Sequence, residues 1–197
     1  MRAHENTVSC LCFANFISTQ TSKGMVTRKC VVSGGFDGKI IMYDITLFKK
    51  AGREPIFVDK VYAHECEILC VFFNEMDGTI LSGGNDGVIK VWEKVFPTQM
   101  KSIGEMKGHT LGVTSIVRDG YFLFSSGEDC NIIMWDSRTR EKLRTFTGHA
   151  FDINMLKIIP ENGNIISCAR DGSIYIWDYR KEKIIFVRFI ITNFNFI

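Results

Sequence analysis

The stretch SGGNDGVIKVWE, residues 82–93, decides the fold of this chain. Its paired glycines, polar turn and lysine fit either a phosphate-binding loop or a tight β-hairpin. A phosphate-binding loop needs a strand before it and a helix after it. Here a second apolar run, Val88 to Trp92, follows at once. Gly87 directly after Asp86 supplies the positive φ angle that a tight hairpin turn favours. We therefore interpret the stretch as two antiparallel strands joined by a turn.

The same stretch recurs three times along the chain. The other copies are SGGFDGKIIMYD at 33–44, SSGEDCNIIMWD at 125–136 and SCARDGSIYIWD at 167–178. In each copy a Ser is followed four residues later by an Asp, and six residues further on by an aromatic residue. Successive aromatic residues are 49, 43 and 42 positions apart, and all three tryptophans occupy this one position. The chain is therefore built from repeats.

The histidines mark a second position of the repeat. The chain has only four, and each follows a small residue, in Ala3-His4, Ala63-His64, Gly108-His109 and Gly148-His149. Between these landmarks lie short apolar runs rich in branched residues, four to a copy, and no stretch has a helical period. Four short strands in each repeat of about 40–50 residues predict the blade of a β-propeller.

Composition limits the class of protein. The chain has 197 residues, of which 46% are hydrophobic and 23% charged, and its net charge is +2. Such a chain is globular, and this charge argues against nucleic-acid and membrane partners. Seven cysteines at irregular spacing indicate a reducing compartment rather than a disulfide framework. With no signal peptide at the start and no apolar run long enough for a bilayer, we expect an intracellular protein, cytoplasmic in preference to nuclear.

The order Gly-His, Ser-x-x-x-Asp, Trp-Asp resembles the WD40 repeat family over residues 3–183. The closing dipeptide is complete in Trp135-Asp136 and Trp177-Asp178, and altered in Tyr43-Asp44 and Trp92-Glu93. The resemblance implies an all-β propeller of four four-stranded blades. Their limits are roughly 3–44 with an outer strand to 62, 63–107, 108–147 and 148–183. An outer strand and an atypical hydrophobic tail follow at 184–197.

The resemblance also implies a buried tetrad in each blade. It runs from an indole N–H through a hydroxyl and an imidazole to a carboxylate. The residue types suit this chain because Trp only donates, whereas Ser and neutral His both donate and accept. A phenol replaces the indole in the first copy, so we expect the first blade to be the least rigid. The implied tetrads are His4/Ser33/Asp37/Tyr43, His64/Ser82/Asp86/Trp92, His109/Ser125/Asp129/Trp135 and His149/Ser167/Asp171/Trp177.

A partner-binding top face is implied as well, since WD40 propellers act as platforms. Three positions in each blade contribute to it: the third and fifth after the His, and the one before the tetrad Asp. We call these twelve residues the predicted contact set: Thr7, Ser9, Phe36, Glu67, Leu69, Asn85, Gly112, Thr114, Glu128, Asp152, Asn154 and Arg170. Any single one is explained equally well as a solvated loop residue.

The character of the predicted contact set favours protein or peptide partners. An exposed aromatic or Arg side chain is the usual anchor of a protein interface, which singles out Phe36 and Arg170. A basic groove for nucleic acid is disfavoured, because Glu67, Glu128 and Asp152 oppose the lone arginine.

The same residues could in principle form catalytic or metal sites, but structural roles explain them better. His, Ser and Asp could form a hydrolase triad, but catalysis has no use for four copies, and none of these serines lies in a nucleophile elbow. His64, Cys66 and Cys70 could bind zinc, but His64 belongs to its tetrad and Cys70 falls in an apolar strand. We therefore expect no catalytic residue, no metal and no cofactor.

Two further features concern insertions and ring closure. Basic, polar insertions at 16–29 and 47–55 are predicted to be surface loops. WD40 rings normally need about seven blades, and this chain supplies four. Three explanations stay open: a fragment or truncated product of a larger protein, two copies pairing open edges into an eight-blade ring, or a self-standing four-blade ring.

The sequence thus leads to three functional hypotheses. The first is a non-catalytic scaffold or adaptor for protein–protein interaction within a larger complex. The second is a substrate-receptor or regulatory subunit of an enzyme complex, for example of ubiquitin ligase type. The third is a truncated fragment without function. Fold alone does not decide among them.

Overall fold

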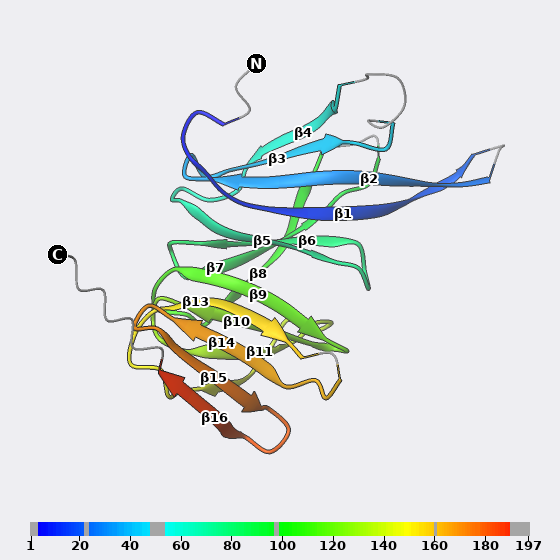
Figure 1. The fold of residues 1–197 in the computed structure, drawn as a ribbon. Coiled ribbons are helices and arrows are strands. Elements are labelled where there is room, and N and C mark those ends of the chain that lie inside the picture. The colour runs from blue at the N-terminus through cyan, green and yellow to red at the C-terminus, as the bar shows by residue number, and fades with distance from the viewer. Residues whose placement is uncertain (1–3, 22–23, 48–53, 97–98, 160, 190–197) are drawn as a thin grey trace. The chain divides into compact units, whose positions relative to one another are not determined.

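The structure is a computed structural model that describes residues 4–21, 24–47, 54–96, 99–159 and 161–189. The regular elements of these residues are sixteen β-strands in four antiparallel sheets of four, in which each strand pairs with the next along the chain (Figure 1). The predicted all-β architecture of four four-stranded blades is confirmed. Within the described part of the chain, no helix is long and apolar enough to cross a membrane.

Each sheet corresponds to one copy of the repeat. The first consists of β1 (Val8–Thr21), β2 (Gly24–Gly35), β3 (Lys39–Asp44) and β4 (Ile56–Tyr62). The second consists of β5 (Ile68–Asn74), β6 (Thr79–Gly84), β7 (Val88–Glu93) and β8 (Lys101–Lys107). The third consists of β9 (Val113–Asp119), β10 (Phe122–Gly127), β11 (Ile132–Asp136) and β12 (Lys142–Phe146). The fourth consists of β13 (Ile153–Ile158), β14 (Ile165–Ala169), β15 (Ser173–Asp178) and β16 (Lys183–Phe189).

The turn between the second and third strands contains a residue with a positive φ angle in all four sheets. Gly38, Gly87 and Gly172 have φ angles of 68°, 75° and 78° at this turn, so the positive φ predicted for Gly87 is confirmed. The third sheet places Cys130 there instead, with φ of 64°. A side chain makes this conformation unfavourable, since its Cβ crowds the following carbonyl oxygen.

The prediction of a surface loop at 16–29 is wrong. β1 and β2 continue through this insertion and stay paired as far as Thr21 and Gly24, so it lengthens the first hairpin (Figure 1). Branched residues on both arms of the insertion, in ISTQT and MVT, favour extended backbone. Of the second insertion, residues 48–53 lie outside the described residues, as do residues 190–197 of the predicted tail.

Two compact units divide the chain, residues 1–107 and 108–197, with two sheets in each. The two sheets of the N-terminal unit share a core in which the Phe16 ring of β1 packs edge-on against Phe73 of β5, with 5.0 Å between ring centroids. The core of the C-terminal unit joins Phe124 of the third sheet to Leu156 and Trp177 of the fourth. In both units, burial of the apolar faces of two sheets holds a blade against its neighbour.

Candidate functional site

The third sheet contains a complete His–Ser–Asp–Trp network. Trp135 Nε1 donates to Ser125 Oγ over 2.8 Å, and His109 Nε2 lies 2.8 Å from the same hydroxyl. His109 Nδ1 lies 2.9 Å from Asp129 Oδ2. Because the carboxylate only accepts, Nδ1 carries the ring proton, and the Ser125 hydroxyl donates to Nε2. Every polar atom of this chain of contacts is therefore satisfied.

The electrostatics of Asp129 follow from this network. Burial raises the pKa of its carboxyl group, but hydrogen bonds from His109 and from the backbone N–H of Thr110 outweigh burial. The net pKa lies below the ordinary value, so the carboxylate is ionised at neutral pH and acts as a fixed acceptor.

The second sheet repeats the network in a looser form. His64 Nε2 lies 2.9 Å from Ser82 Oγ, which accepts the indole N–H of Trp92 over 2.9 Å. The distance from His64 Nδ1 to Asp86 Oδ2 is 3.3 Å. The side chain of Asp86 is 37% exposed, compared with 4% for Asp129, so solvent reaches this end of the network.

The fourth sheet lacks the contact between histidine and aspartate. His149 Nε2 lies 2.6 Å from Ser167 Oγ, and Trp177 Nε1 donates to that hydroxyl over 2.8 Å. His149 Nδ1, however, lies 3.1 Å from Ser173 Oγ. The carboxylate of Asp171 accepts the backbone N–H of Ser173 over 2.9 Å. The structure therefore does not bring Asp171 directly to His149 as the family resemblance implied, and Ser173 lies between them.

Ala169 accounts for this difference. The equivalent residue is a glycine in the other three copies, at 35, 84 and 127. A Cβ atom on Gly127 would lie only 2.8 Å from His109 Nδ1 and 2.9 Å from Asp129 Oδ1. A methyl group at this position therefore leaves no room for a direct contact between imidazole and carboxylate, and Ala169 carries one.

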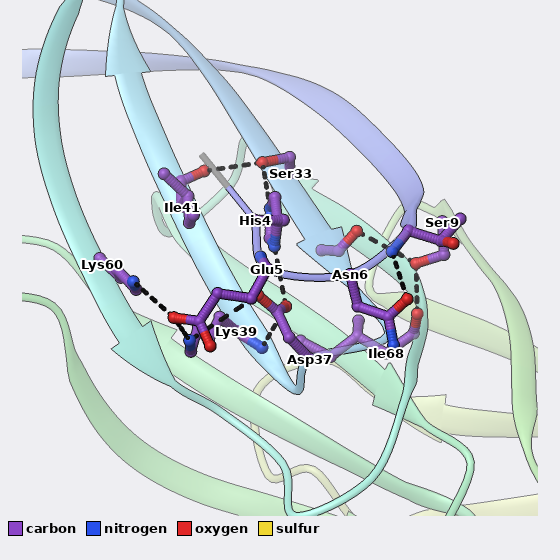
Figure 2. A network of polar contacts seen from close by, with 12 residues as sticks. His4, Glu5, Asn6, Ser9, Ser33, Asp37, Lys39, Ile41, Lys60 and Ile68 are labelled. Atoms are coloured by element: carbon purple, nitrogen blue, oxygen red, sulfur yellow. Dashed lines mark hydrogen bonds and ion pairs between the residues drawn. The ribbon is translucent and has the colours of Figure 1, made fainter. Parts of the chain in front are cut away.

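Figure 2 shows the network of the first sheet. His4 Nε2 lies 2.9 Å from Ser33 Oγ and its Nδ1 lies 2.8 Å from Asp37 Oδ1. Among the described residues, Tyr43 makes no hydrogen bond to Ser33. Its ring instead packs edge-on against Phe57, with centroids 5.9 Å apart. The phenol thus does not replace the indole, and the further contact of Ser33 Oγ is with the carbonyl oxygen of Ile41, 3.4 Å away (Figure 2).

A cluster of charges extends the first network (Figure 2). The backbone N–H of Glu5 donates to Asp37 over 3.0 Å, and the Glu5 carboxylate lies 2.5 Å from Lys39 Nζ and 3.8 Å from Lys60 Nζ. The hydrogen bond from Lys39 lowers the pKa of Glu5 and, in turn, raises the pKa of the lysine. The ammonium group of Lys39 also lies over the Tyr62 ring, 4.7 Å from its centroid.

Eight residues of the predicted contact set are held together in pairs. In each sheet the N–H of the residue before the tetrad Asp donates to the carbonyl oxygen of the third residue after the His. The four distances are all 2.9 Å, for Phe36 to Thr7, Asn85 to Glu67, Glu128 to Gly112 and Arg170 to Asp152. Two loops of each blade are thereby fixed to one another, and their side chains start from a defined backbone.

Side-chain contacts strengthen two of these pairs. Asn85 Nδ2 donates to Glu67 over 3.2 Å, and Arg170 lies 3.4 Å from the Asp152 carboxylate. Thr7, Phe36, Asn85, Asn154 and Arg170 are exposed, whereas Gly112 is buried. Glu67, Leu69, Glu128 and Asp152 are half-buried.

The fifth position after the His has a role that the sequence did not indicate. The hydroxyl of Ser9 reaches the carbonyl oxygen of Ile68 in the next sheet (Figure 2). Thr114 makes the equivalent contact with the carbonyl oxygen of Ile153. Both hydroxyls therefore join two sheets within one unit. The signal in the sequence is a hydroxyl residue at the same repeat position of the first and third copies.

The buried serines are placed for structure rather than nucleophilic attack. Ser82, Ser125 and Ser167 are fully buried, and each is held between an indole and an imidazole. A nucleophilic serine would instead have to expose its oxygen to a substrate. The chemistry that this arrangement supports is recognition at the exposed loops.

Comparison with known proteins agrees with this geometry. The family model described as "WD domain, G-beta repeat" matches residues 1–44, 55–93, 100–136 and 140–178. The nuclear distribution protein nudF of Aspergillus flavus is 30% identical over 121 residues, which is 59% of this chain and 26% of that protein. Cilia- and flagella-associated protein 52 of Macaca fascicularis is 24% identical over 180 residues, which is 91% of this chain and 28% of that protein.

The chain thus spans little more than a quarter of the length of these relatives. Among solved structures, the crystal structure of the computationally designed Ika4 protein is similar, with a TM-score of 0.66 and 24% identity. The similarity covers 90% of this chain and 94% of the designed chain, and it concerns the fold alone.

Proposed function

Because the chain belongs to the WD40 repeat family, we propose that it is a non-catalytic scaffold that binds other proteins or peptides through the predicted contact set. The observation that carries this proposal is the pairing of the loops at 2.9 Å in all four sheets. A backbone fixed before binding loses little conformational entropy when a partner docks, which favours affinity.

The anchors of the interface are Phe36 and Arg170. Phe36 is 41% exposed although its N–H is tied to Thr7. The Arg170 side chain is 75% exposed and its pairing with Asp152 is at the surface, so the guanidinium is available to a partner at little cost. Aromatic and Arg side chains dominate the energy of most interfaces.

The relatives support a role inside the cell. One is named for nuclear distribution and the other for association with cilia and flagella. Both names refer to structures of the cell, and we extend an intracellular role to this chain.

Self-association through an open blade face is part of the same proposal. Leu11 and Phe13 on β1 and Phe57 on β4 are 61%, 68% and 56% exposed. In the strand register Phe13 pairs with Val31, Val31 with Tyr43 and Tyr43 with Phe57, so Phe13 and Phe57 lie on one face of the first sheet, and Leu11, two residues before Phe13, lies on the same face. Sedimentation over a range of concentrations should show association that Phe13→Glu weakens. A monomer at every concentration would contradict self-association and leave the scaffold role standing.

The scaffold role is tested by capture of partners from the cells that express the chain. Tagged wild-type chain, Phe36→Ala and Arg170→Ala are compared, with Tyr121→Ala and Arg138→Ala as matched exposed controls outside the predicted contact set. We expect each of the first two variants to lose about tenfold or more of partner recovery, and the controls to retain it. Recovery that both Phe36→Ala and Arg170→Ala leave unchanged would overturn the assignment of this face.

A further inference from the structure

Within the described part of the chain, the second sheet carries a cluster of metal-ligating side chains that its three counterparts lack. His64, Cys66 and Asp86 each offer one ligand atom, and these atoms all lie within 4.8 Å of one another. Cys66 stands two residues after the histidine, where the other copies have Asn6, Leu111 and Phe151. The thiol is thus specific to this blade.

His64 can serve the network and a metal ion at the same time. Its Nε2 atom lies 2.9 Å from Ser82 Oγ, which orients the ring and directs Nδ1 toward Asp86. An imidazole that binds a metal ion through one ring nitrogen ordinarily makes a hydrogen bond through the other nitrogen. Membership of the tetrad argued against zinc at the level of sequence, and it does engage both nitrogens of His64. An ion would replace only the 3.3 Å contact between Nδ1 and Asp86 and would leave the contact between Nε2 and Ser82 in place.

The spacing of the nitrogen and the carboxylate fits a tetrahedral ion. His64 Nδ1 and Asp86 Oδ2 are 3.3 Å apart, whereas the equivalent atoms are 2.8 Å apart in the first sheet and 2.9 Å apart in the third. Two ligands at the bond lengths of zinc stand about 3.3 Å apart in a tetrahedron. An ion between them therefore requires little movement.

Access and rigidity also distinguish this cluster. The side chain of Asp86 is 37% exposed, compared with 7% for Asp37, so an ion can enter from solvent and keep a water ligand. The N–H groups of Ala63 and His64 donate to the carbonyl oxygen of Gly38, and that of Asn85 donates to Glu67. The segment that carries the histidine and the thiol is thus fixed at both ends.

We propose that His64 Nδ1, Cys66 Sγ and an Asp86 oxygen bind a divalent cation of the zinc class, with water as the fourth ligand. A mixed nitrogen, sulfur and oxygen set suits zinc, and one thiolate with one carboxylate balances its charge. Binding releases the thiol proton, and the ring proton of the neutral imidazole moves from Nδ1 to Nε2, which faces Ser82 Oγ. Cys70, the third ligand considered from sequence, is buried in β5, and Asp86 takes its place.

Cobalt(II) is the probe, because its absorption spectrum reports both thiolate ligation and tetrahedral geometry. Titration of the purified full chain should give a saturable thiolate-to-cobalt charge-transfer band with one ion bound per chain, and added zinc should abolish it. The band should disappear in Cys66→Ser. Asp86→Asn should weaken binding about tenfold or more. Cys130→Ser, which removes a half-buried thiol beside the tetrad Asp of the third sheet, should leave the band unchanged.

Circular dichroism separates loss of binding from loss of fold. Among the described residues, the half-buried Cys66 thiol forms hydrogen bonds only with nearby backbone groups, the Glu67 carbonyl oxygen at 3.6 Å and the backbone of Asn85 and Asp86, so Cys66→Ser and Cys66→Ala should keep the wild-type spectrum. The proposal is overturned if the folded wild-type chain gives no charge-transfer band, or if the band survives in both Cys66 variants.

Discussion

His149 Nδ1 lies 3.1 Å from Ser173 Oγ, at the point where its counterparts in the other three sheets meet an aspartate. This contact accompanies the methyl group of Ala169, which replaces the glycine of the other copies. In the fourth sheet, Ala169 replaces the glycine and Ser173 takes the place of the aspartate at the imidazole. These two differences together complete the network.

A double-mutant cycle tests this link. Ser173→Ala leaves His149 Nδ1 without a partner and should lower the free energy of unfolding by about 1–3 kcal/mol. In an Ala169→Gly background the same change should cost less, because Asp171 regains room to reach the ring. Urea unfolding of the four proteins measures the difference. Equal costs in both backgrounds would show that the methyl group does not exclude the aspartate.

The reverse exchange should damage the third sheet. Gly127→Ala introduces a Cβ less than 3 Å from both His109 Nδ1 and Asp129 Oδ1. We expect it to destabilise the chain by about 1–3 kcal/mol, with part of the loss recovered when Asn131→Ser is added. Asn131 occupies the repeat position of Ser173. Thermal melts of the single and double variants would show whether the hydroxyl rescues the network.

The aromatic position should differ in sensitivity between copies. Trp135→Phe removes the indole N–H that Ser125 accepts, so about 1–3 kcal/mol of unfolding free energy should be lost. Tyr43→Phe should stay within about 0.5 kcal/mol, since the Tyr43 hydroxyl does not reach Ser33. A large effect of Tyr43→Phe in denaturant unfolding would mean that the phenol does complete the first network.

Cys130→Gly should stabilise the chain. Cys130 has φ of 64° at a turn where the other three copies have glycine. Relief of the crowded Cβ should raise the free energy of unfolding by about 1 kcal/mol. Cys168→Gly in strand β14, where the backbone is extended, is the matched control and should destabilise instead. Stabilisation by neither change would argue against strain at the turn.

Acid should weaken the fourth sheet before its carboxylates are protonated. Burial lowers the pKa of His149 below 6.5, and the charge of Asp171 opposes this only in part. The unfolded chain then binds a proton at a pH where the folded chain does not, so stability falls as pH drops below 6.5. Urea unfolding at about pH 7.5 and about pH 5.5 should show this loss, and His149→Gln should reduce it. A rise in stability on acidification would contradict it.

Much of the fold was accessible from the sequence because its signals are local. The alternation of apolar residues and the Asp-Gly turns depend on neighbours in the chain, and they predicted the strands around Gly87 correctly. The insertion at 16–29 forms paired strands and not the predicted loop, because its branched residues favour extended backbone although its composition is polar.

The sequence by itself determined the repeat, the four four-stranded sheets and the residues that supply each network. The landmark residues have nearly the same spacing in each copy, so they occupy the same position in each sheet. The tertiary structure decided which atoms meet. Contacts between residues far apart in the chain depend on single Cβ atoms and carbonyl oxygens, as with Ser173 beside His149, 24 positions away, and Ser9 against Ile68, 59 positions away. Whether two side-chain atoms can approach to about 3 Å depends on how the backbones around them pack. Neighbouring residues in the sequence do not determine this.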